Sequence, residues 1–446
     1  MSEITAKNEN PAIESNLKGF AFFWSGQLVS LLGSSIIQFV LAWWVTIETE
    51  SPLLLSLATF VGFIPTIILT PIAGVFVDRW NRKLLIGTVD FLQAAVTVVL
   101  LFLFKFNKVT IGILFIFLAL RGVFQAFHQP AIQALIPIMV PRKHLSRTNS
   151  IQFFLSNIIF MIGPIIAALL FSILDIHHIL WLDAITFGVA VIPLILVKIP
   201  KLAKEKLEPK EKKPSFFSEF KEGIGFMRQQ KGLFALLGSF AGTNFFLMPM
   251  FVLLNLFIYV NHGGGETELS FVLAFNQAGS IVGTILFIFW KGFKKKVNGV
   301  AMGIFVGLIG CLMVAFTPTG LYWFMGIGFL IVGFFVSMAN ISSQTIWQSV
   351  VPKEMLGRVM AVRIAVAQFV SPLGMIFSGL IAEVVNIQYV MISSVSLGII
   401  SIIIFYFFSN MRRVEENILP ENPIEELPSE KIETISGKEV EVISPP

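Results

Sequence analysis

The chain has 446 residues, of which 55% are hydrophobic and only 13% are charged, and 46 of them are phenylalanine. Soluble globular proteins carry about 25% charged residues, so the composition excludes a soluble protein and predicts one embedded in a lipid bilayer. The net charge of +5 is spread over loops between apolar runs rather than gathered on one folded face, which argues against a nucleic-acid partner.

Twelve apolar runs are each long enough to cross a bilayer, for which about 17 to 25 mostly apolar residues are needed. They predict an all-α integral membrane protein with two sets of six spans separated by a polar segment. The turn Thr317-Pro318-Thr319-Gly320 alone separates the ninth run from the tenth. The expected limits are 17–47, 53–77, 84–104, 109–131, 148–173, 178–198, 232–260, 268–290, 298–317, 320–347, 357–384 and 387–410.

The turn between the second and third runs concentrates charge. Asp78 stands there with three bases, Arg79, Arg82 and Lys83, within residues 74–83. Charge this dense does not enter hydrocarbon, and the excess of Arg and Lys places the turn at the cytoplasmic face. The turn therefore fixes the predicted orientation of the chain.

This turn resembles the G-x-x-x-D-R-x-G-R-K signature of the major facilitator superfamily, beginning at Gly74. The resemblance implies two pseudo-symmetric six-helix bundles and a gating role for the turn. Asp78 is expected to cap the eleventh helix near Gly357 and Arg358 in an outward-facing state, while the three bases add pairs that hold the cytoplasmic gate shut. Asn81 replaces the usual Gly, and we expect it to adopt the positive φ of a tight turn. The alternative is an ordinary positive-inside loop that does not move.

A second motif lies in the fifth run. Gly163-Pro164, followed by Ile-Ile-Ala, is similar to the G-P-x-x-G element of antiporters in the superfamily. Proline removes a backbone donor and small residues let helices approach closely, so a plain packing role is the alternative. Trp24-Ser25-Gly26-Gln27 and Ile199-Pro200-Lys201-Leu202 look like the macrolide-efflux branch. That branch exports macrolide antibiotics and is taken to use the proton gradient.

Polar segments divide the chain into five parts. The linker has a basic run followed by an apolar stripe, which predicts an amphipathic helix on the inner membrane surface, although a helix packed on a neighbouring loop fits equally well. The tail is rich in Glu and Pro and is expected to be disordered. The parts are a cytoplasmic N-terminus (1–16), the N-terminal bundle (17–200), the linker (201–231), the C-terminal bundle (232–411) and a cytoplasmic tail (412–446).

An internal repeat supports the two-fold division. The pattern V-P-[RK]-x-x-L-x-R occurs at 140–147 and again 211 residues later at 351–358. The same offset aligns Gly163 with Gly374, so the halves look like parallel copies that rock about a site near the midplane.

The basic residues test the topology. All but three of the 32 Lys and Arg residues fall on segments that it places in the cytoplasm, the exceptions being Lys105, Lys108 and Arg121. This bias predicts a multi-pass plasma-membrane protein with both termini in the cytoplasm.

Ionisable residues within spans are costly and often functional. Asp90, Arg121 and Asp183 are such residues, and adjacent helices are expected to bring Asp90 and Arg121 within reach. In one interpretation Asp90 or Asp183 takes up a proton as substrate leaves, and in the other Asp90 and Arg121 form a permanent pair that fixes packing. For Asp183 we favour a structural role near the outer boundary. The first run has no internal carboxylate, and Glu48 at its outer end is a further candidate for proton coupling.

In this fold the first, fourth, seventh and tenth helices are expected to line a central cavity. A mainly apolar cavity with few polar groups suits a large amphipathic compound. Amides in spans more often join helices than bind ligands, and His128 is expected to be a satisfied polar residue. The candidate cavity residues are Gln27, Gln38, Asn244, Asn340 and Gln344.

Together these features predict a secondary active exporter of hydrophobic or amphipathic compounds such as macrolide-type drugs, acting as a monomer by proton antiport with alternating access. The alternatives are an exporter of an endogenous metabolite, such as a siderophore or lipid-like compound, and a non-transporting membrane receptor. The sequence has no nucleotide-binding loop, no zinc motif and no plausible Ser/His/Asp set. We therefore expect neither an enzyme, nor a metal, nor a cofactor.

Overall fold

The computed structural model describes residues 17–141, 144–197, 216–290 and 292–417. Within these ranges twelve helices are long and apolar enough to cross a membrane, which confirms the predicted all-α membrane fold. The turn at Gly320, with φ of 82°, does separate two spans. The spans are α1 (Leu17–Thr49), α2 (Pro52–Arg79), α3 (Arg82–Lys105), α4 (Ile111–Met139), α5 (Leu145–Phe171), α6 (Ile176–Leu196), α8 (Leu233–Leu256), α9 (Glu266–Phe289), α10 (Lys296–Ala315), α11 (Tyr322–Val350), α12 (Lys353–Ala382) and α13 (Ile387–Phe408).

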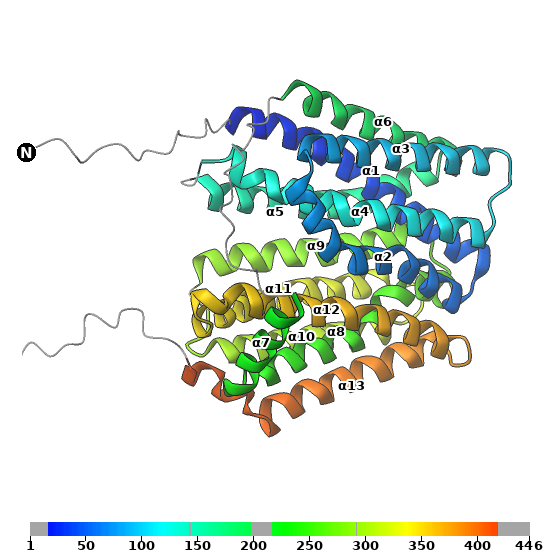
Figure 1. Cartoon of the computed structure of the whole chain (residues 1–446). Coiled ribbons are helices and arrows are strands. Elements are labelled where there is room, and N and C mark those ends of the chain that lie inside the picture. Colours follow the sequence, from blue (N-terminus) through cyan, green and yellow to red (C-terminus); the bar gives the residue numbers. More distant parts are fainter. Residues whose placement is uncertain (1–16, 142–143, 198–215, 291, 418–446) are drawn as a thin grey trace, which may run out of the picture.

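Two halves of six spans each lie side by side (Figure 1). Helices α1–α6 form the upper half in that view and α8–α13 form the lower half. The halves meet mainly where α2 packs on α12 and where α5 packs on α9. A short helix, α7 (Phe216–Gln229), lies at the end of the molecule where α1 begins. We call this end the α7 face and the other end the opposite face.

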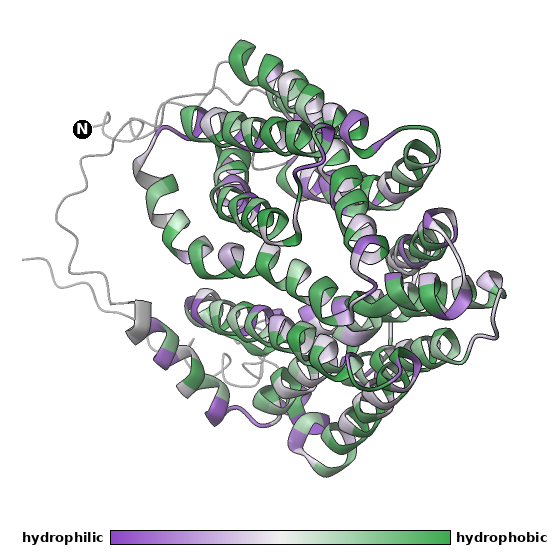
Figure 2. Cartoon of the chain, turned by 90° about the vertical axis from the view of Figure 1, so that its right-hand side faces the viewer, coloured by the Kyte–Doolittle hydropathy of each residue, from purple (hydrophilic) through white to green (hydrophobic). Residues whose placement is uncertain are grey.

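Apolar residues cover the long helices, and hydrophilic residues gather mainly at the turns (Figure 2). Large hydrophobic side chains remain exposed on the spans, among them Phe289, Val384 and Phe408, each more than four-fifths exposed. In water such a surface would drive aggregation, whereas lipid tails solvate it. The exposed apolar surface therefore follows from the predicted location in a bilayer.

Small residues let the helices of each half approach closely. A Cβ built on Gly122 of α4 would lie 2.4 Å from the carbonyl oxygen of Gly62 on α2. In the other half a Cβ on Gly333 of α11 would lie 1.9 Å from the carbonyl oxygen of Asn276 on α9. Gly122 and Gly333 are 211 residues apart, the offset of the sequence repeat. The repeat thus preserves the same helix contact in both halves.

The proposed antiporter motif makes a similar contact. A Cβ on Gly163 of α5 would lie 2.2 Å from Oγ of Ser35 on α1. Its repeat partner Gly374 on α12 has equally little room, because a Cβ there would lie 2.7 Å from the carbonyl oxygen of Phe245 on α8. Pro164 is buried. Close packing between the first and fifth helix of each half is what the motif provides here.

Two local expectations, for the end of α4 and for the backbone of Asn81, are wrong. Helix α4 continues from its expected end at 131 to Met139, because Pro130 is accommodated inside it as membrane helices allow. Asn81 has φ of −68° rather than a positive value. It caps α3 instead, since its side-chain oxygen accepts from the backbone N–H groups of Lys83 at 3.1 Å and Leu84 at 3.3 Å.

The predicted disorder of the tail does not begin at 412. A 3-10 helix, η3 (Asn410–Asn417), buries Met411 and Val414. Oε1 of Glu415 accepts from the backbone N of Val297 at 2.9 Å, where an acid is favoured near the start of α10. Residues 1–16 and 418–446, to which we assigned the cytoplasmic N-terminus and the rest of the tail, lie outside the described residues.

Within the predicted linker, residues 216–229 form helix α7, whereas the basic run that precedes it lies outside the described residues. Met227 of α7 is fully buried, and Phe220 and Ile224 pack against the same apolar core. These residues contact the protein, chiefly through the packing of α7 on α12, so the described part of the stripe does not face lipid.

We predict that Gly333→Ala destabilises the protein, because the new methyl group would overlap a backbone oxygen that cannot move away. The cost of such overpacking is typically about 1–3 kcal/mol, enough to lower the midpoint of thermal unfolding by several degrees. Gly188→Ala on α6 is the matched control, since no atom lies within 4 Å of a Cβ built there. Unfolding of purified protein in detergent measures both. Equal midpoints for the two variants would contradict close packing of α9 on α11.

Candidate functional site

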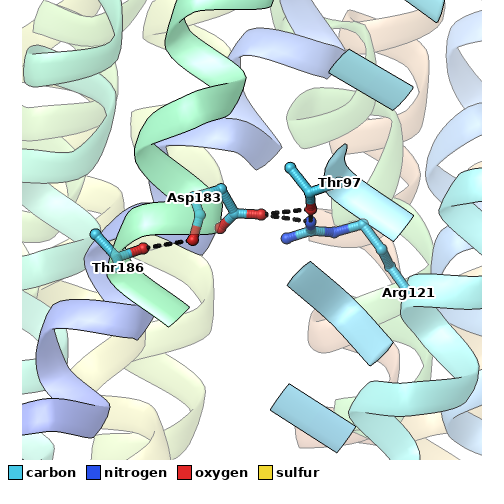
Figure 3. Close-up of polar contacts among 4 residues, drawn as sticks. All are labelled: Thr97, Arg121, Asp183 and Thr186. Carbon is cyan, nitrogen blue, oxygen red and sulfur yellow. Dashed lines mark hydrogen bonds and ion pairs between the residues drawn. The ribbon is translucent and has the colours of Figure 1, made fainter. Parts of the chain in front are cut away.

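Asp183 and Arg121 form a buried ion pair between α6 and α4 (Figure 3). Nη1 of Arg121 lies 2.6 Å from Oδ2 of Asp183, whose side chain is fully buried. Thr97 of α3 joins them, donating to the same carboxylate oxygen at 2.8 Å and accepting from Arg121 at 2.7 Å. A guanidinium does not lose its proton in proteins, so Asp183 faces a permanent positive charge.

A second buried acid lies nearer the α7 face. Oδ1 of Asp90 on α3 lies 2.9 Å from Nε2 of His128 on α4, and the Asp90 side chain is fully buried. The distance suits a hydrogen bond, but the ring N–H is not aligned with the carboxylate. Gln27 of α1 donates to the other oxygen at 3.5 Å. An imidazole and a carboxylate placed in this way can share or exchange a proton.

Several polar atoms around Asp90 have no hydrogen-bond partner among the described residues. They are buried atoms of Gln27, Gln93 and His128. Buried polar groups are normally satisfied, and ordered water often supplies the missing bond. The surroundings of Asp90 are therefore suited to hold water, which a proton needs to reach a buried acid.

The expected pairing of Asp90 with Arg121 is wrong. Arg121 and His128 are seven residues apart on α4, so they share one face of the helix but lie about 10 Å apart along it. Asp90 and Thr97 have the same spacing on α3. Packing of α3 on α4 sets Asp90 beside His128 and Thr97 beside Arg121. The shared seven-residue spacing is the sequence signal that identifies the correct partners.

The C-terminal half lacks this network. The repeat offset of 211 residues leads from each of the four ionisable residues to a residue that carries no charge. The two halves therefore share a helix arrangement but not their buried chemistry. The four equivalents are Ala301 for Asp90, Val332 for Arg121, Ala339 for His128 and Ser394 for Asp183.

A cavity of about 130 Å³ lies in the C-terminal half, between α8, α10, α11 and α12. Its wall is mainly apolar, with Leu237, Phe240 and Ile304 among the lining residues. Drug-sized ligands occupy about 300–1,000 Å³, so in this conformation the cavity accommodates only a fragment of such a ligand. Its polar lining residues are Thr243, Asn244, Asn340 and Arg363.

The predicted cavity residues divide into two groups. Asn244 and Asn340 line the cavity, and Gln344 lies beside it, accepting from Nη1 of Arg363 at 2.5 Å. Gln27 belongs instead to the Asp90 cluster, and Gln38 is an exposed residue of α1 outside this cavity.

Arg363 was missed by sequence reasoning, which grouped it with the basic residues that follow the tenth span. It stands about 15 Å along α12 from the helix start, well within the span.

The signature turn makes contacts within its own half. Nζ of Lys83 donates to the carbonyl oxygens of Ile195 and Val197 at 2.8 Å each, where α6 ends. Arg82 donates to the carbonyl oxygen of Ala134 on α4 at 3.5 Å. No atom lies within 4 Å of a Cβ built on Gly74. The side chains of Asp78 and Arg79 lie outside the described part of the structure.

The expected partner of the signature turn is engaged elsewhere. Nη1 of Arg358, near the start of α12, lies 2.7 Å from Oε1 of Glu222 on α7. A Cβ on Gly223 of α7 would lie 2.9 Å from the carbonyl oxygen of Arg358. In this conformation α7 therefore occupies the side of α12 near Arg358.

At the opposite face, Glu383 joins the two halves. Its Oε2 accepts from Oγ of Ser51 and from the backbone N of Leu53, both at 3.2 Å. Ser51 is the N-cap of α2, where an acid is favoured by the helix dipole. The apolar core is also continuous between the halves at this face, through residues such as Trp43 and Phe257, whereas a separate core cluster around Phe23 serves the N-terminal half at the α7 face.

One group of side chains has metal-ligand spacing. Among the described residues, Asp175, His177 and His178 have their ligand atoms within 4.8 Å of one another, at the N-cap and in the first turn of α6. Asp175 and His178 are exposed and 4.0 Å apart, as in an ordinary surface ion pair. Glu48, the outer candidate for proton coupling, is likewise exposed at the end of α1.

Comparisons with known proteins agree with a transporter. A family model described as Major Facilitator Superfamily matches residues 23–363 and 253–440. Macrolide efflux protein A of Streptococcus pyogenes is 28% identical over 396 residues, covering 89% of this chain and 97% of the relative. The staphyloferrin A transporter of Staphylococcus aureus is 23% identical over 400 residues, covering 88% and 96%. The crystal structure of a bacterial homologue of the iron transporter ferroportin in its inward-facing state has the same fold, with a TM-score of 0.67 at 16% identity over 88% of this chain and 100% of that one.

We predict that Glu383→Gln loosens the opposite face, because the neutral amide binds the start of α2 less strongly than a carboxylate does. A cysteine at Ser56, which is fully buried beside Gly379, would report the change, and the native Cys311 is buried and silent. For a partly solvated pair we expect roughly a two- to fivefold faster reaction with a membrane-impermeant maleimide.

The matched control is Glu50→Gln in the turn between α1 and α2, since Glu50 is an exposed acid of the same face. Equal labelling of Ser56→Cys in the Glu383→Gln and Glu50→Gln backgrounds would mean that Glu383 does not hold the halves together.

Proposed function

The chain belongs to the major facilitator superfamily, and from that premise we propose that it is a secondary active exporter of hydrophobic or amphipathic compounds, driven by proton antiport. It is a multi-pass membrane transporter. The observation that carries the proton-coupled mechanism is the pair of fully buried acids in one half, each beside a base. Transport by alternating access would expose these acids and the cavity to the two sides in turn.

The substrate class is supported by relatives and by the cavity. Macrolide efflux protein A is named for drug export, and the cavity wall here is mainly apolar with a few polar groups. Such walls suit large amphipathic molecules, because contact area rather than dense hydrogen bonding supplies affinity. Macrolide-type drugs are therefore the first compounds to test.

Orientation follows from charge. The α7 face carries the signature turn and the lysines that precede α10, whereas acids such as Glu48, Glu266 and Glu383 stand at the opposite face. The positive-inside rule then favours a cytoplasmic location for the α7 face. We propose that the protein lies in the plasma membrane and works as a monomer. On this assignment the continuous core and the Glu383 contacts close the outer side, and the molecule faces inward.

The two buried acids have different roles in this proposal. Asp183 is held by Arg121 and Thr97, so this contact fixes α3, α4 and α6 together. Asp90 faces His128, an imidazole that can accept or donate a proton, and polar atoms without a hydrogen-bond partner among the described residues lie beside this pair. Asp90 and His128 together form the proton site, and substrate leaves as this site takes up a proton.

Gating would use both ends of α2 and α12. In the inward-facing form Glu383 at the end of α12 caps the start of α2. In the outward-facing form Asp78 at the end of α2 would cap the start of α12, after Arg358 leaves Glu222. One acid on each helix would thus stabilise one closed state.

A second candidate is an exporter of an endogenous acidic metabolite such as a siderophore. It is favoured by one observation, the positively charged Arg363 in the cavity wall, and by similarity to a staphyloferrin A transporter. A non-transporting receptor would bind ligand without gradient-dependent flux, so flux measured under a pH gradient separates a receptor from either exporter.

We predict that a pH gradient, acidic inside, drives accumulation of a macrolide that carries no amine in inverted vesicles that contain the wild-type protein. Asp90→Asn should abolish gradient-driven accumulation but retain exchange of labelled for unlabelled drug, because the amide mimics a permanently protonated acid. Asp183→Asn should instead lower the yield of folded protein, since an unpaired buried charge costs about 3–5 kcal/mol.

Accumulation that is insensitive to the gradient in the wild type would exclude proton antiport. Full gradient-driven accumulation by Asp90→Asn would assign the proton to another site.

A further inference from the structure

Arg363 is a membrane-embedded cation without an ionic partner in the described structure. No carboxylate oxygen of the described residues lies within 4.0 Å of its guanidinium. Its polar contacts are Gln344, which accepts at 2.5 Å, and the weak acceptor Sδ of Met360 at 3.9 Å. It also lies over the ring of Trp347, 5.7 Å from the ring centroid.

The sequence offers no acid that could approach it from within its own half. Residues 232–411 contain four carboxylates, all at helix ends rather than within the spans: Glu266, Glu268, Glu354 and Glu383. Position 152, which matches Arg363 in the repeat, holds Gln, so the cation is an addition to the shared framework. A charge at this depth is costly unless a partner or water offsets it.

The groups that accompany Arg363 in the cavity wall are also donors. Asn244 and Asn340 each bring an amide that has no hydrogen-bond partner among the described residues. Trp347, beside the guanidinium, has a buried indole N–H that likewise has no acceptor there. No lining residue is acidic. The remainder of the wall is apolar, with Leu237, Phe240 and Ile304 on one side of the polar groups.

We infer that Arg363 binds the anionic head group of an amphipathic substrate, with the apolar part of the substrate against α8 and α10. The inference rests on the proposed function, because it names the class of compound that the exporter takes. A carboxylate supplies the missing counter-charge and accepts from the guanidinium and the amides, whereas a cationic amine would add a second positive charge next to Arg363. The site therefore selects acids over amines of the same shape.

Three probes that share a phenylbutyl group and differ only in the head group test the selection of acids over amines. They are 4-phenylbutyrate, 4-phenylbutanol and 4-phenylbutylamine, titrated by calorimetry into the full-length protein in phosphatidylcholine nanodiscs. We expect the wild type to bind the acid at least about tenfold more tightly than the alcohol, because a hydrogen bond to a charged group contributes about that much to affinity. The amine should bind most weakly. An amine that binds as tightly as the acid would overturn the inference without any variant.

Substitutions of Arg363 then test whether this residue causes the preference for the acid. Arg363→Gln should bring the affinity for the acid to that of the alcohol, and Arg363→Lys, which keeps the charge, should retain most of the preference. Arg413→Gln removes an exposed arginine outside the spans and should behave as the wild type. A preference that survives Arg363→Gln would overturn the inference.

A lipid head group is the competing source of the same negative charge. Nanodiscs that contain phosphatidylglycerol separate the two: undiminished binding of the acid supports a soluble substrate, and displacement of the acid assigns the site to lipid and overturns the inference. All of these titrations are made without a gradient. Selective binding without flux would therefore reject only the exporter function, and flux without acid selection would reject only this inference.

Discussion

An ionised side chain inside a bilayer has to be offset by an opposite charge, by dipoles or by water, because hydrocarbon offers none of these. The N-terminal half meets this requirement internally, since Arg121 offsets Asp183 and His128 faces Asp90 on the same three helices. The C-terminal half does not, because Arg363 has only neutral partners. In our proposal the N-terminal half, whose buried acids have basic partners, exchanges protons. The C-terminal half, whose Arg363 has no acidic partner among the described residues, binds a charged ligand.

The same helix framework supports both kinds of chemistry. Glycine contacts at Gly122 and Gly333, and at Gly163 and Gly374, recur at the repeat offset and let the equivalent helices pack closely in both halves. Backbone contacts of this kind depend on small residues and not on charge, so the polar residues between them can diverge freely. Closure at the opposite face depends on a charged contact instead, because Glu383 binds the start of α2. Glu383 is exposed, so this contact can break when the halves move relative to each other.

The positions of the helices could be predicted from the sequence, whereas most contacts between side chains of different helices could not. Hydropathy and the repeat gave the twelve spans, the turn before Tyr322 and the pairing of the halves. The partner of Asp90 depends on helix depth, which the seven-residue spacing on α3 and α4 encodes but residue type alone does not. Glu383 acts on a residue 332 positions away, and Asn81 caps a helix where a strained turn was expected. Contacts that close only when distant helices pack leave no local signal.

The division of roles between the halves is tested most directly by proton release on ligand binding. Purified wild-type and Asp90→Asn proteins would be mixed with 4-phenylbutyrate in weakly buffered solution containing a pH indicator. A proton site at Asp90 and His128 and a ligand site at Arg363 predict that both proteins bind the acid, and that the wild type releases protons while Asp90→Asn releases none. Equal proton release by the two proteins would contradict the assignment of the proton to the N-terminal half.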